Sequence, residues 1–347
     1  MSNLPSLVLI HGSWHTPACW DPILAILKSK HNLNCTAVTL PSNTNNPAAT
    51  LKDDIDAAQS AVSAEVSRGR DVVIIAHSYG GMVGNSCIKG FARPSPPQST
   101  DKTQLQSSSP ATLTRTETDK GHVIGLILIA SGFTLTGYAF MDLFFGMELP
   151  FFRANRETGF AELRTPLGPK QLFYHDLPDP EAEYWVSQLT TQSLKALFEG
   201  SEHAYAGWKD VPTWYIGTSE DKSMPVAVQR ISVGVAKGMG GEIEHRELPT
   251  SHSPFLSLPG ETVGVVVEAV EAFTGASIVS QDSAEQQRDW VTRRSDVVTV
   301  PGARLLRPLT WISFGLPLAF GRFVGCGIWF FARGRRAWRS RFGLRSA

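Results

Sequence analysis

Short runs of apolar residues recur along the first 250 positions of the chain. Six of them have the length of a strand: Leu7–Ile10, Ala37–Leu40, Val72–Ala76, Val123–Ala130, Trp214–Ile216 and Ile243–Leu248. In the first five the apolar residues are largely continuous and do not alternate with polar ones, which is typical of parallel strands covered on both faces. The pattern therefore predicts a central sheet that is buried between helices.

Segments with helix signals lie between these runs. The clearest is Thr50–Arg68, which opens on a residue type favoured at helix N-caps and carries Asp53 and Asp54 in its first turn. The other segments are Trp20–Lys30, Tyr79–Phe91, Pro225–Lys237 and Pro259–Phe273, the last of which is closed by Gly275. Because strand and helix alternate, we predict an α/β fold with a mainly parallel sheet flanked by helices.

Four stretches interrupt or extend this alternation and set the expected domain boundaries. Residues 1–275 form the predicted α/β domain. Within it, residues 92–120 hold 11 Ser or Thr and four Pro with almost nothing apolar, so we expect a disordered surface loop. Residues 133–210 show no clear strand and many aromatic residues, which indicates a helical cap. Residues 276–302 are polar and are interpreted as a linker to a tail, residues 303–347.

The composition is that of a globular protein. The chain has 347 residues, 42% of them hydrophobic, and 32 basic against 32 acidic residues. A net charge of zero argues against nucleic acid binding through overall charge. The four cysteines form no CxxC and no Cys/His cluster, and there is no Walker loop or GxGxxG after a strand, so we expect no disulfide framework, metal or cofactor. The N-terminus has no signal peptide pattern, so we expect a cytoplasmic protein.

The tail differs from the rest of the chain in charge. Residues 303–347 contain nine Arg and no Lys, Asp or Glu, which leaves the preceding 302 residues at −9. Leu309–Ala332 is long enough to span a bilayer, but Arg322, Pro317 and four Gly oppose a spanning helix. We therefore favour contact with a membrane surface, with Trp and Phe at the interface and Arg on anionic lipid. A spanning segment and an extension without a role are the alternatives.

The sharpest chemical signal is the sequence VVIIAHSYGG at residues 72–81, where an apolar strand runs into Ser78 and a helix follows. This is the pattern of a nucleophile elbow, with Ala76 in place of the usual first Gly. The turn needs small residues two positions before and after the nucleophile, and Ala76 and Gly80 meet that need. A helix N-terminus here favours negative charge developing at Ser78. The other interpretation is a buried Ser in an ordinary strand–helix turn.

A second signal, the HGSW segment at residues 11–14, follows the first strand. An oxyanion needs two converging backbone N–H donors. We expect one from Tyr79, the residue after the nucleophile, and one from Ser13, since Gly12 lets the backbone approach closely. Three histidines near these motifs are expected to have supporting roles: His11 and His77 in the loops, and His15 in the pocket.

The acid and the base of a catalytic triad should follow the nucleophile, in the order Ser, Asp or Glu, His. Two carboxylates, Glu220 and Asp221, follow the fifth strand, and we favour Asp221. His252 lies in the loop between the next strand and the last helix. In this hypothesis its Nε2 takes the proton of Ser78 while Asp221 holds its Nδ1–H.

Together these motifs resemble the α/β-hydrolases, and within them a branch of small enzymes with plant methylesterases and hydroxynitrile lyases. The resemblance covers about residues 5–274 and rests on LVLIHGSWHTPACW, VVIIAHSYGGM, TWYIGTSEDKSMP and the histidine loop. In that branch the acid of the matching segment is the Asp, which supports Asp221 over Glu220. The lyases carry Thr at the position of Gly12 and Lys directly after the catalytic His, where this chain has Ser253. The resemblance therefore implies hydrolysis in preference to lyase chemistry.

The predicted function is cleavage of an ester, thioester or lactone of a small apolar molecule through an acyl-enzyme. The aromatic residues of the cap are expected to pack it on the domain and, in part, to line an apolar pocket. A ligand receptor on the same fold and a C–C lyase are the alternatives. The sequence leaves the substrate's identity and the oligomeric state open.

Overall fold

The computed structural model describes most of the chain in five long segments. These are residues 4–94, 120–144, 151–164, 167–278 and 315–341, together with residues 146, 148–149, 298–299 and 312. Most of the loop expected at residues 92–120 and most of the linker expected at residues 276–302 therefore lie outside the described residues.

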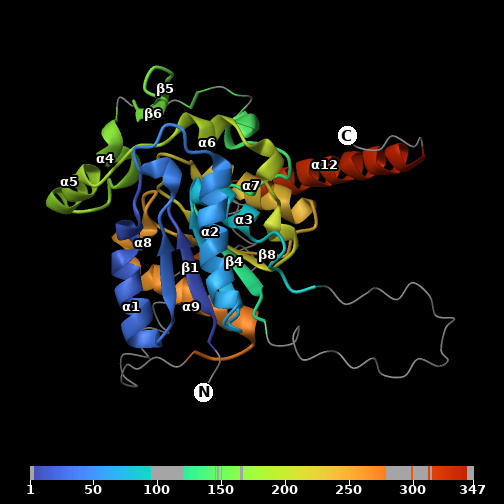
Figure 1. The fold of residues 1–347 in the computed structure, drawn as a ribbon, viewed down its shortest axis with the longest axis horizontal. Coiled ribbons are helices and arrows are strands. Elements are labelled where there is room, and N and C mark those ends of the chain that lie inside the picture. The colour runs from blue at the N-terminus through green and yellow to red at the C-terminus, as the bar shows by residue number, and fades with distance from the viewer. Residues whose placement is uncertain are drawn as a thin grey trace.

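A seven-stranded sheet forms the centre of the described structure (Figure 1). In spatial order its strands are β2 (Cys35–Val38), β1 (Ser6–Ile10), β3 (Val72–His77), β4 (Val123–Ile129), β7 (Thr213–Thr218), β8 (Ile243–Leu248) and β9 (Val298–Thr299). The first six are parallel, which confirms the predicted fold class, and β9 pairs antiparallel with β8 at the edge. Strands β1, β3 and β7 are buried along their whole length, as expected for strands covered on both faces.

The register of the sheet brings the carboxyl ends of its strands together. Ile10 lies opposite Ala76 in the β1–β3 pair, and Thr218 lies opposite Leu248 in the β7–β8 pair. Strand β4 joins the two pairs. The loops that follow β1, β3, β7 and β8 therefore leave the sheet at the same end.

Helices cover both faces of this sheet. They are α1 (Asp21–His31), α2 (Leu51–Val66), α3 (Gly80–Cys87), α7 (Val226–Gly238), α8 (Pro254–Ser257) and α9 (Pro259–Thr274). In Figure 1 α2 lies in front of the sheet and α9 behind it. The N-terminus of α2 has a capping box, since the Thr50 hydroxyl accepts from the Asp53 N–H and the Asp53 carboxylate accepts from the Thr50 N–H.

The cap contains strands as well as helices, which corrects the expectation for residues 133–210. Its helices are α4 (Gly168–Phe173), α5 (Asp179–Ser187) and α6 (Leu194–Phe198), and its strands, β5 (Phe152–Asn155) and β6 (Phe160–Leu163), form an antiparallel hairpin. Strands of four residues are too short to give a clear period. The turn between them holds Gly159 at a φ of 77°, a value that favours Gly. Figure 1 shows these elements together at the top of the molecule.

Part of the tail packs on the α/β domain. Helix α12 (Leu316–Arg341) runs against α7 and then extends away from the body (Figure 1). The two backbones approach closely, because a Cβ at Gly321 or Gly325 would collide with the carbonyl oxygens of Ile231 and Val235 in α7. The small residues at these two positions therefore allow a close helix pair that no local pattern indicated.

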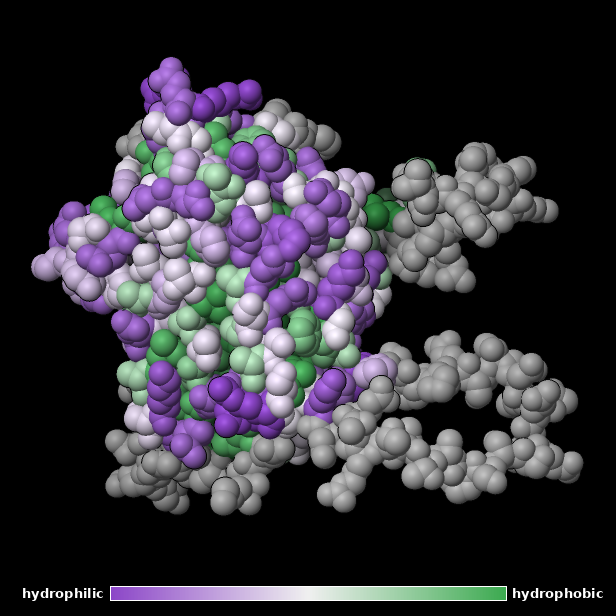
Figure 2. Space-filling model, viewed as in Figure 1, coloured by the Kyte–Doolittle hydropathy of each residue, from purple (hydrophilic) through white to green (hydrophobic). Residues whose placement is uncertain are grey.

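Helix α12 also presents apolar side chains to solvent. Leu316, Phe320, Phe323, Phe330 and Phe331 are each more than half exposed. Figure 2 shows hydrophobic atoms where α12 leaves the body, while hydrophilic side chains cover much of this face of the domain. Among the described residues, no helix combines the length and the hydropathy that crossing a membrane requires.

Candidate active site

Ser78 stands at the turn between β3 and α3, on a strained backbone. Its φ is 51°, a left-handed value that is uncommon for residues other than Gly. Its N–H donates to the carbonyl of Ile129 at 3.1 Å, and its carbonyl accepts from the Ser131 hydroxyl at 2.6 Å. These bonds to the end of β4 hold the turn in place and present Ser78 at the carboxyl end of the sheet.

Two glycines allow the loops around Ser78 to approach one another. A Cβ at Gly80 would lie 2.6 Å from the carbonyl oxygen of Ile10 in β1. A Cβ at Gly12 would lie 2.9 Å from both Nδ1 of His77 and Cβ of Ser78. The loop after β1 can therefore pack against the nucleophile turn only because neither position carries a side chain.

His252 and Asp221 form a buried pair. Nδ1–H of His252 donates to Oδ2 of Asp221 at 2.7 Å, and the two residues are only 2% and 6% exposed. The Thr218 hydroxyl also donates to Oδ2 at 2.8 Å, and the N–H groups of Ser223 and Met224 donate to Oδ1 at 2.7 and 2.8 Å. A carboxylate fixed in this way holds the imidazole in one orientation, with Nε2 as the unprotonated nitrogen of the neutral ring.

The neighbouring carboxylate, Glu220, is exposed, and among the described residues no hydrogen bond joins its side chain to His252. The structure therefore places Asp221, the favoured of the two candidates, against the imidazole. Gln229 on α7 adds a contact that the sequence analysis missed, since its buried Nε2 lies 3.3 Å from Oδ2 of Asp221 and donates to the Met224 carbonyl at 2.6 Å. No motif marks Gln229, and only the packing of α7 on β7 brings it to the site.

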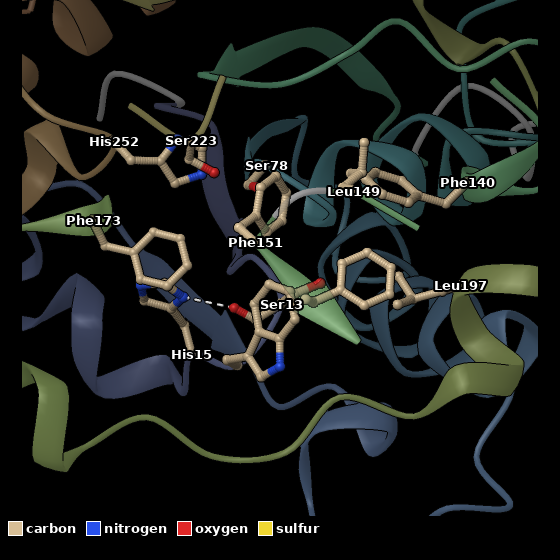
Figure 3. Close-up of a pocket in the computed structure, with 12 residues that line it drawn as sticks. Ser13, His15, Ser78, Phe140, Leu149, Phe151, Phe173, Leu197, Ser223 and His252 are labelled. Carbon is tan, nitrogen blue, oxygen red and sulfur yellow. Dashed lines mark hydrogen bonds between the residues drawn. The ribbon is translucent and has the colours of Figure 1, made fainter. Parts of the chain in front are cut away.

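Ser78 and His252 line one cavity beneath the cap (Figure 3). The empty space between its walls is about 390 Å³, including the part open to solvent. Among the described atoms no hydrogen bond joins Ser78 Oγ to His252 Nε2, a contact that often tightens only when substrate binds. Besides Ser13, His15 and Ser223, the remaining wall is apolar: Trp14, Phe140, Leu149, Phe151, Phe152, Phe173 and Leu197.

Ser13 lines this cavity, and Tyr79 directly follows Ser78 in the turn before α3. Within the described residues the backbone N–H of neither residue donates a hydrogen bond. The Tyr79 side chain is anchored in the core, where its hydroxyl donates to Oδ2 of Asp54 at 2.7 Å. Burial raises the pKa of Asp54 to about 6. In the sequence Asp54 is marked only as an acidic residue of the first turn of α2, although it lies beside Leu51 and Ile55 on the buried face of that helix.

Buried neutral histidines hold the loops around the catalytic candidates. Nε2–H of His77 donates to the His252 carbonyl at 3.0 Å, and Nδ1–H of His11 donates to the Gly12 carbonyl at 2.9 Å. Burial lowers the pKa of His11 to about 4 and that of His77 well below its usual range. Both rings are therefore uncharged near pH 7. No group of three or more His, Cys, Asp or Glu side chains in the described part of the chain could hold a metal ion.

His15 connects the cap to the loop that contains Ser13. Its Nδ1–H donates to the Ser13 carbonyl at 2.8 Å, the dashed line in Figure 3. The hydroxyl of Tyr174, directly after α4, donates to its Nε2 at 2.8 Å. Burial lowers the pKa of His15 to about 3, so the ring keeps one donor and one acceptor nitrogen. Tyr174 carries no sequence signal for this role.

A family model described as the alpha/beta hydrolase family matches residues 7–265. The chain belongs to the α/β-hydrolase family. The matched range includes every candidate site residue from His11 to His252. Over 271 residues this hydrolase is 24% identical to the alpha/beta hydrolase nvfD of Aspergillus novofumigatus, an alignment that covers 76% of this chain and 96% of the relative.

Solved structures show the same fold. A pyrethroid hydrolase from Sphingobium faniae superimposes with a TM-score of 0.57 at 20% identity, over 78% of this chain and 99% of the other. A methylesterase from Arabidopsis gives a TM-score of 0.52 at 17% identity, over 78% of this chain and all of the other. The α/β-hydrolase fold predicted from the sequence motifs is therefore confirmed.

Proposed function

We propose that this α/β-hydrolase is a serine esterase that cleaves an ester, thioester or lactone of a small apolar molecule. The observation that carries the proposal is the hydrogen bond between Asp221 and His252, together with the cavity that His252 lines with Ser78 on its strained turn. The names of two structural neighbours, a pyrethroid hydrolase and a methylesterase, support hydrolysis of an ester.

In the first half of the reaction, Ser78 Oγ attacks the carbonyl carbon of the substrate as its proton passes to Nε2 of His252. Asp221 stabilises the imidazolium that forms. The carbonyl oxygen becomes an oxyanion, and the N–H groups of Ser13 and Tyr79 are the donors that bind it. When the carbon–oxygen bond to the leaving group breaks, His252 gives its proton to the departing alcohol and an acyl-enzyme remains.

In the second half, water replaces the alcohol. His252 takes one proton of the water as its oxygen attacks the acyl carbonyl, and the same two N–H groups bind the second oxyanion. Collapse of this intermediate returns the proton from His252 to Ser78 Oγ and releases the acid. The cycle needs no group beyond the residues on the cavity wall, Asp221 and the Tyr79 N–H.

The cavity wall indicates the class of substrate. Seven of the twelve residues that line the cavity are apolar, and none of the twelve is Lys, Arg, Asp or Glu. Burial of a carboxylate or phosphate without a cation would be costly. A neutral, apolar ester therefore fits the wall better than a charged one.

Two features argue against lyase chemistry. The residue after His252 is Ser253, which is buried and uncharged, so no cation stands beside the base for a cyanide leaving group. A Thr at the position of Gly12 would collide with His77 and Ser78 unless the loop moved. Hydrolysis is the reaction that this arrangement supports.

The experiment is a panel of neutral esters with varied acyl and alcohol parts, assayed with the wild type and with Ser78→Ala. The proposal expects turnover of some apolar esters by the wild type and loss of nearly all of it in the folded variant. A receptor would bind apolar ligands but turn over none of the panel. Turnover that survives in Ser78→Ala would contradict the proposed nucleophile.

A further inference from the structure

Trp14 stands between the catalytic cavity and a second hollow. It lines the cavity that contains Ser78, and it also lines a groove on the cap side with about 650 Å³ of empty space, including the part open to solvent. The other groove residues come from the β5–β6 hairpin and the segment before α6: Thr158, Phe160, Ala161, Glu162, Leu163, Thr190 and Thr191. Within the part of the chain that the structure describes, Trp14 is the one residue that lines both spaces.

Two hydrogen bonds, one from the indole ring and one to the backbone carbonyl, hold Trp14 in this position. Its Nε1–H donates to the Ala161 carbonyl at 2.8 Å, and the Trp14 carbonyl accepts from the Thr190 N–H at 2.7 Å. Trp14 is only 6% exposed, and its φ of 62° is left-handed. A bulky residue held in this strained conformation by two partners of the cap is a built part of the wall.

The spaces on the two sides of the indole are similar in chemistry. In the catalytic cavity the indole lies 6.2 to 6.4 Å, between ring centroids, from Phe151, Phe152 and Phe173. In the groove the half-buried side chains of Phe160 and Leu163 provide apolar surface. An apolar chain that passed the position of the indole would therefore meet apolar surface on both sides.

We propose that Trp14 sets the upper length of the substrate's apolar group, and that the groove accommodates longer chains when the indole is removed. The natural substrate then has a compact group on this side of the scissile carbonyl. This inference rests on the proposed esterase function, because it assumes that the substrate lies beside Ser78.

The variant that tests the proposal best is Trp14→Gly. Glycine adopts a φ of 62° without strain, so the loop keeps its course and its bond to Thr190 while the indole is lost. Phe140→Ala is the matched control, because Phe140 lines the catalytic cavity but not the groove. The Phe140→Ala substitution enlarges the catalytic cavity but leaves the Trp14 indole between the cavity and the groove. Trp14→Phe is a second, milder variant in case the glycine variant fails to fold.

The probes are alkyl fluorophosphonates with ethyl, hexyl and dodecyl chains, and the readout is the rate of Ser78 modification by intact mass. We expect the wild type to react with the short probe faster than with the dodecyl probe. Trp14→Gly should raise the dodecyl-to-ethyl rate ratio about tenfold or more, as pocket contacts discriminate chain length on that scale. Trp14→Phe should raise it less, and Phe140→Ala should leave it close to the wild-type value.

An unchanged ratio in folded Trp14→Gly, or in folded Trp14→Phe if the glycine variant is unfolded, would overturn the proposal. An equal rise in Phe140→Ala would also overturn it, because cavity size alone would then explain the effect. These outcomes are separate from a failure of the proposed function. If Ser78 is labelled but no ester is turned over, the esterase proposal fails, whereas the dodecyl-to-ethyl rate ratio still decides the role of Trp14. If no probe labels Ser78, both proposals fail.

Discussion

The hydroxyl of Tyr174 donates a hydrogen bond of 2.8 Å to Nε2 of His15, and the other ring nitrogen of His15 donates to the Ser13 carbonyl. All three residues are buried. A cap residue thus fixes the loop whose N–H is proposed to bind the oxyanion. The position of the cap and the geometry of the proposed oxyanion hole are linked by this chain of two hydrogen bonds.

Tyr174→Phe removes one hydroxyl and leaves Nε2 of His15 as a buried acceptor without a donor. We expect a loss of about 1–3 kcal/mol in the free energy of unfolding. We also expect kcat to fall about tenfold with little change in KM, because the oxyanion exists only after attack. Steady-state kinetics and urea unfolding measure both effects. Tyr184→Phe, at an exposed tyrosine of the cap, is the control. A rise in KM with an unchanged kcat would contradict the link to the oxyanion hole.

Asp221→Asn should harm turnover far more than Glu220→Gln. Asp221 holds His252 through a 2.7 Å hydrogen bond, whereas the Glu220 side chain is exposed. Replacing the carboxylate lets the imidazole adopt the wrong tautomer, which in a triad lowers kcat by about 10⁴-fold. Glu220→Gln should stay close to the wild-type rate. The reverse order of the two variants in kcat assays would move the acid to Glu220.

The sequence was sufficient to predict the six parallel strands of the sheet and the residues at their carboxyl ends, whereas β9 falls in the segment expected to be a linker. A buried parallel strand appears in the sequence as a continuous apolar run such as Val72–Ala76, because every position of such a strand faces apolar neighbours. Ser78, Asp221 and His252 follow three strands of the predicted parallel sheet, so strand order alone indicated that they would lie together. Their triad role stays a prediction that the experiments here address.

Contacts between segments that are distant in the chain could not be predicted from the sequence. The β5–β6 hairpin has strands of four residues, and its place in the cap depends on pairing that no local period shows. Asp54, Gln229 and Tyr174 reach the site through the packing of α2, α7 and the end of α4. Such side chains look like ordinary helix and loop residues until the tertiary structure is known.

Stability should fall as the pH is lowered below about 6.5. Burial holds the pKa of His11 at about 4 and that of His15 at about 3, against 6.5 in the unfolded chain. Below pH 6.5 the unfolded chain therefore binds protons that the native protein does not, and at pH 5 each histidine costs about 2 kcal/mol of stability. Asp54 has the opposite effect. Its pKa is raised to about 6, so its protonation in the native protein at pH 5 offsets about 1 kcal/mol of the lost stability.

Urea unfolding at pH 7 and pH 5 measures this effect. His15→Gln should reduce the difference between the two pH values, since glutamine does not titrate. His203→Gln, at a partly exposed histidine, is the control and should leave the difference unchanged. Equal free energies of unfolding at the two pH values in the wild type would contradict the account of the buried histidines.

Helix α12 should bind anionic membrane surfaces. Its exposed phenylalanines and the arginines of residues 303–347 match an apolar interface and anionic headgroups. We expect the full chain to sediment with vesicles that contain phosphatidylserine and to be partly released by high salt. A triple variant, Phe320→Ser, Phe323→Ser and Phe330→Ser, should stay in the supernatant, whereas Tyr184→Ser should behave as the wild type. Wild-type protein that stays in the supernatant would exclude this contact.

The central claim is that Ser78 carries a covalent acyl group during turnover. The most direct measurement is rapid acid quenching of a reaction with p-nitrophenyl acetate, followed by intact mass and peptide mapping. The account predicts an acetyl adduct on Ser78, a burst of p-nitrophenol of about one equivalent of enzyme, and neither signal in folded Ser78→Ala. An adduct on another residue, or Ser78→Ala with about a tenth or more of wild-type turnover, would contradict it.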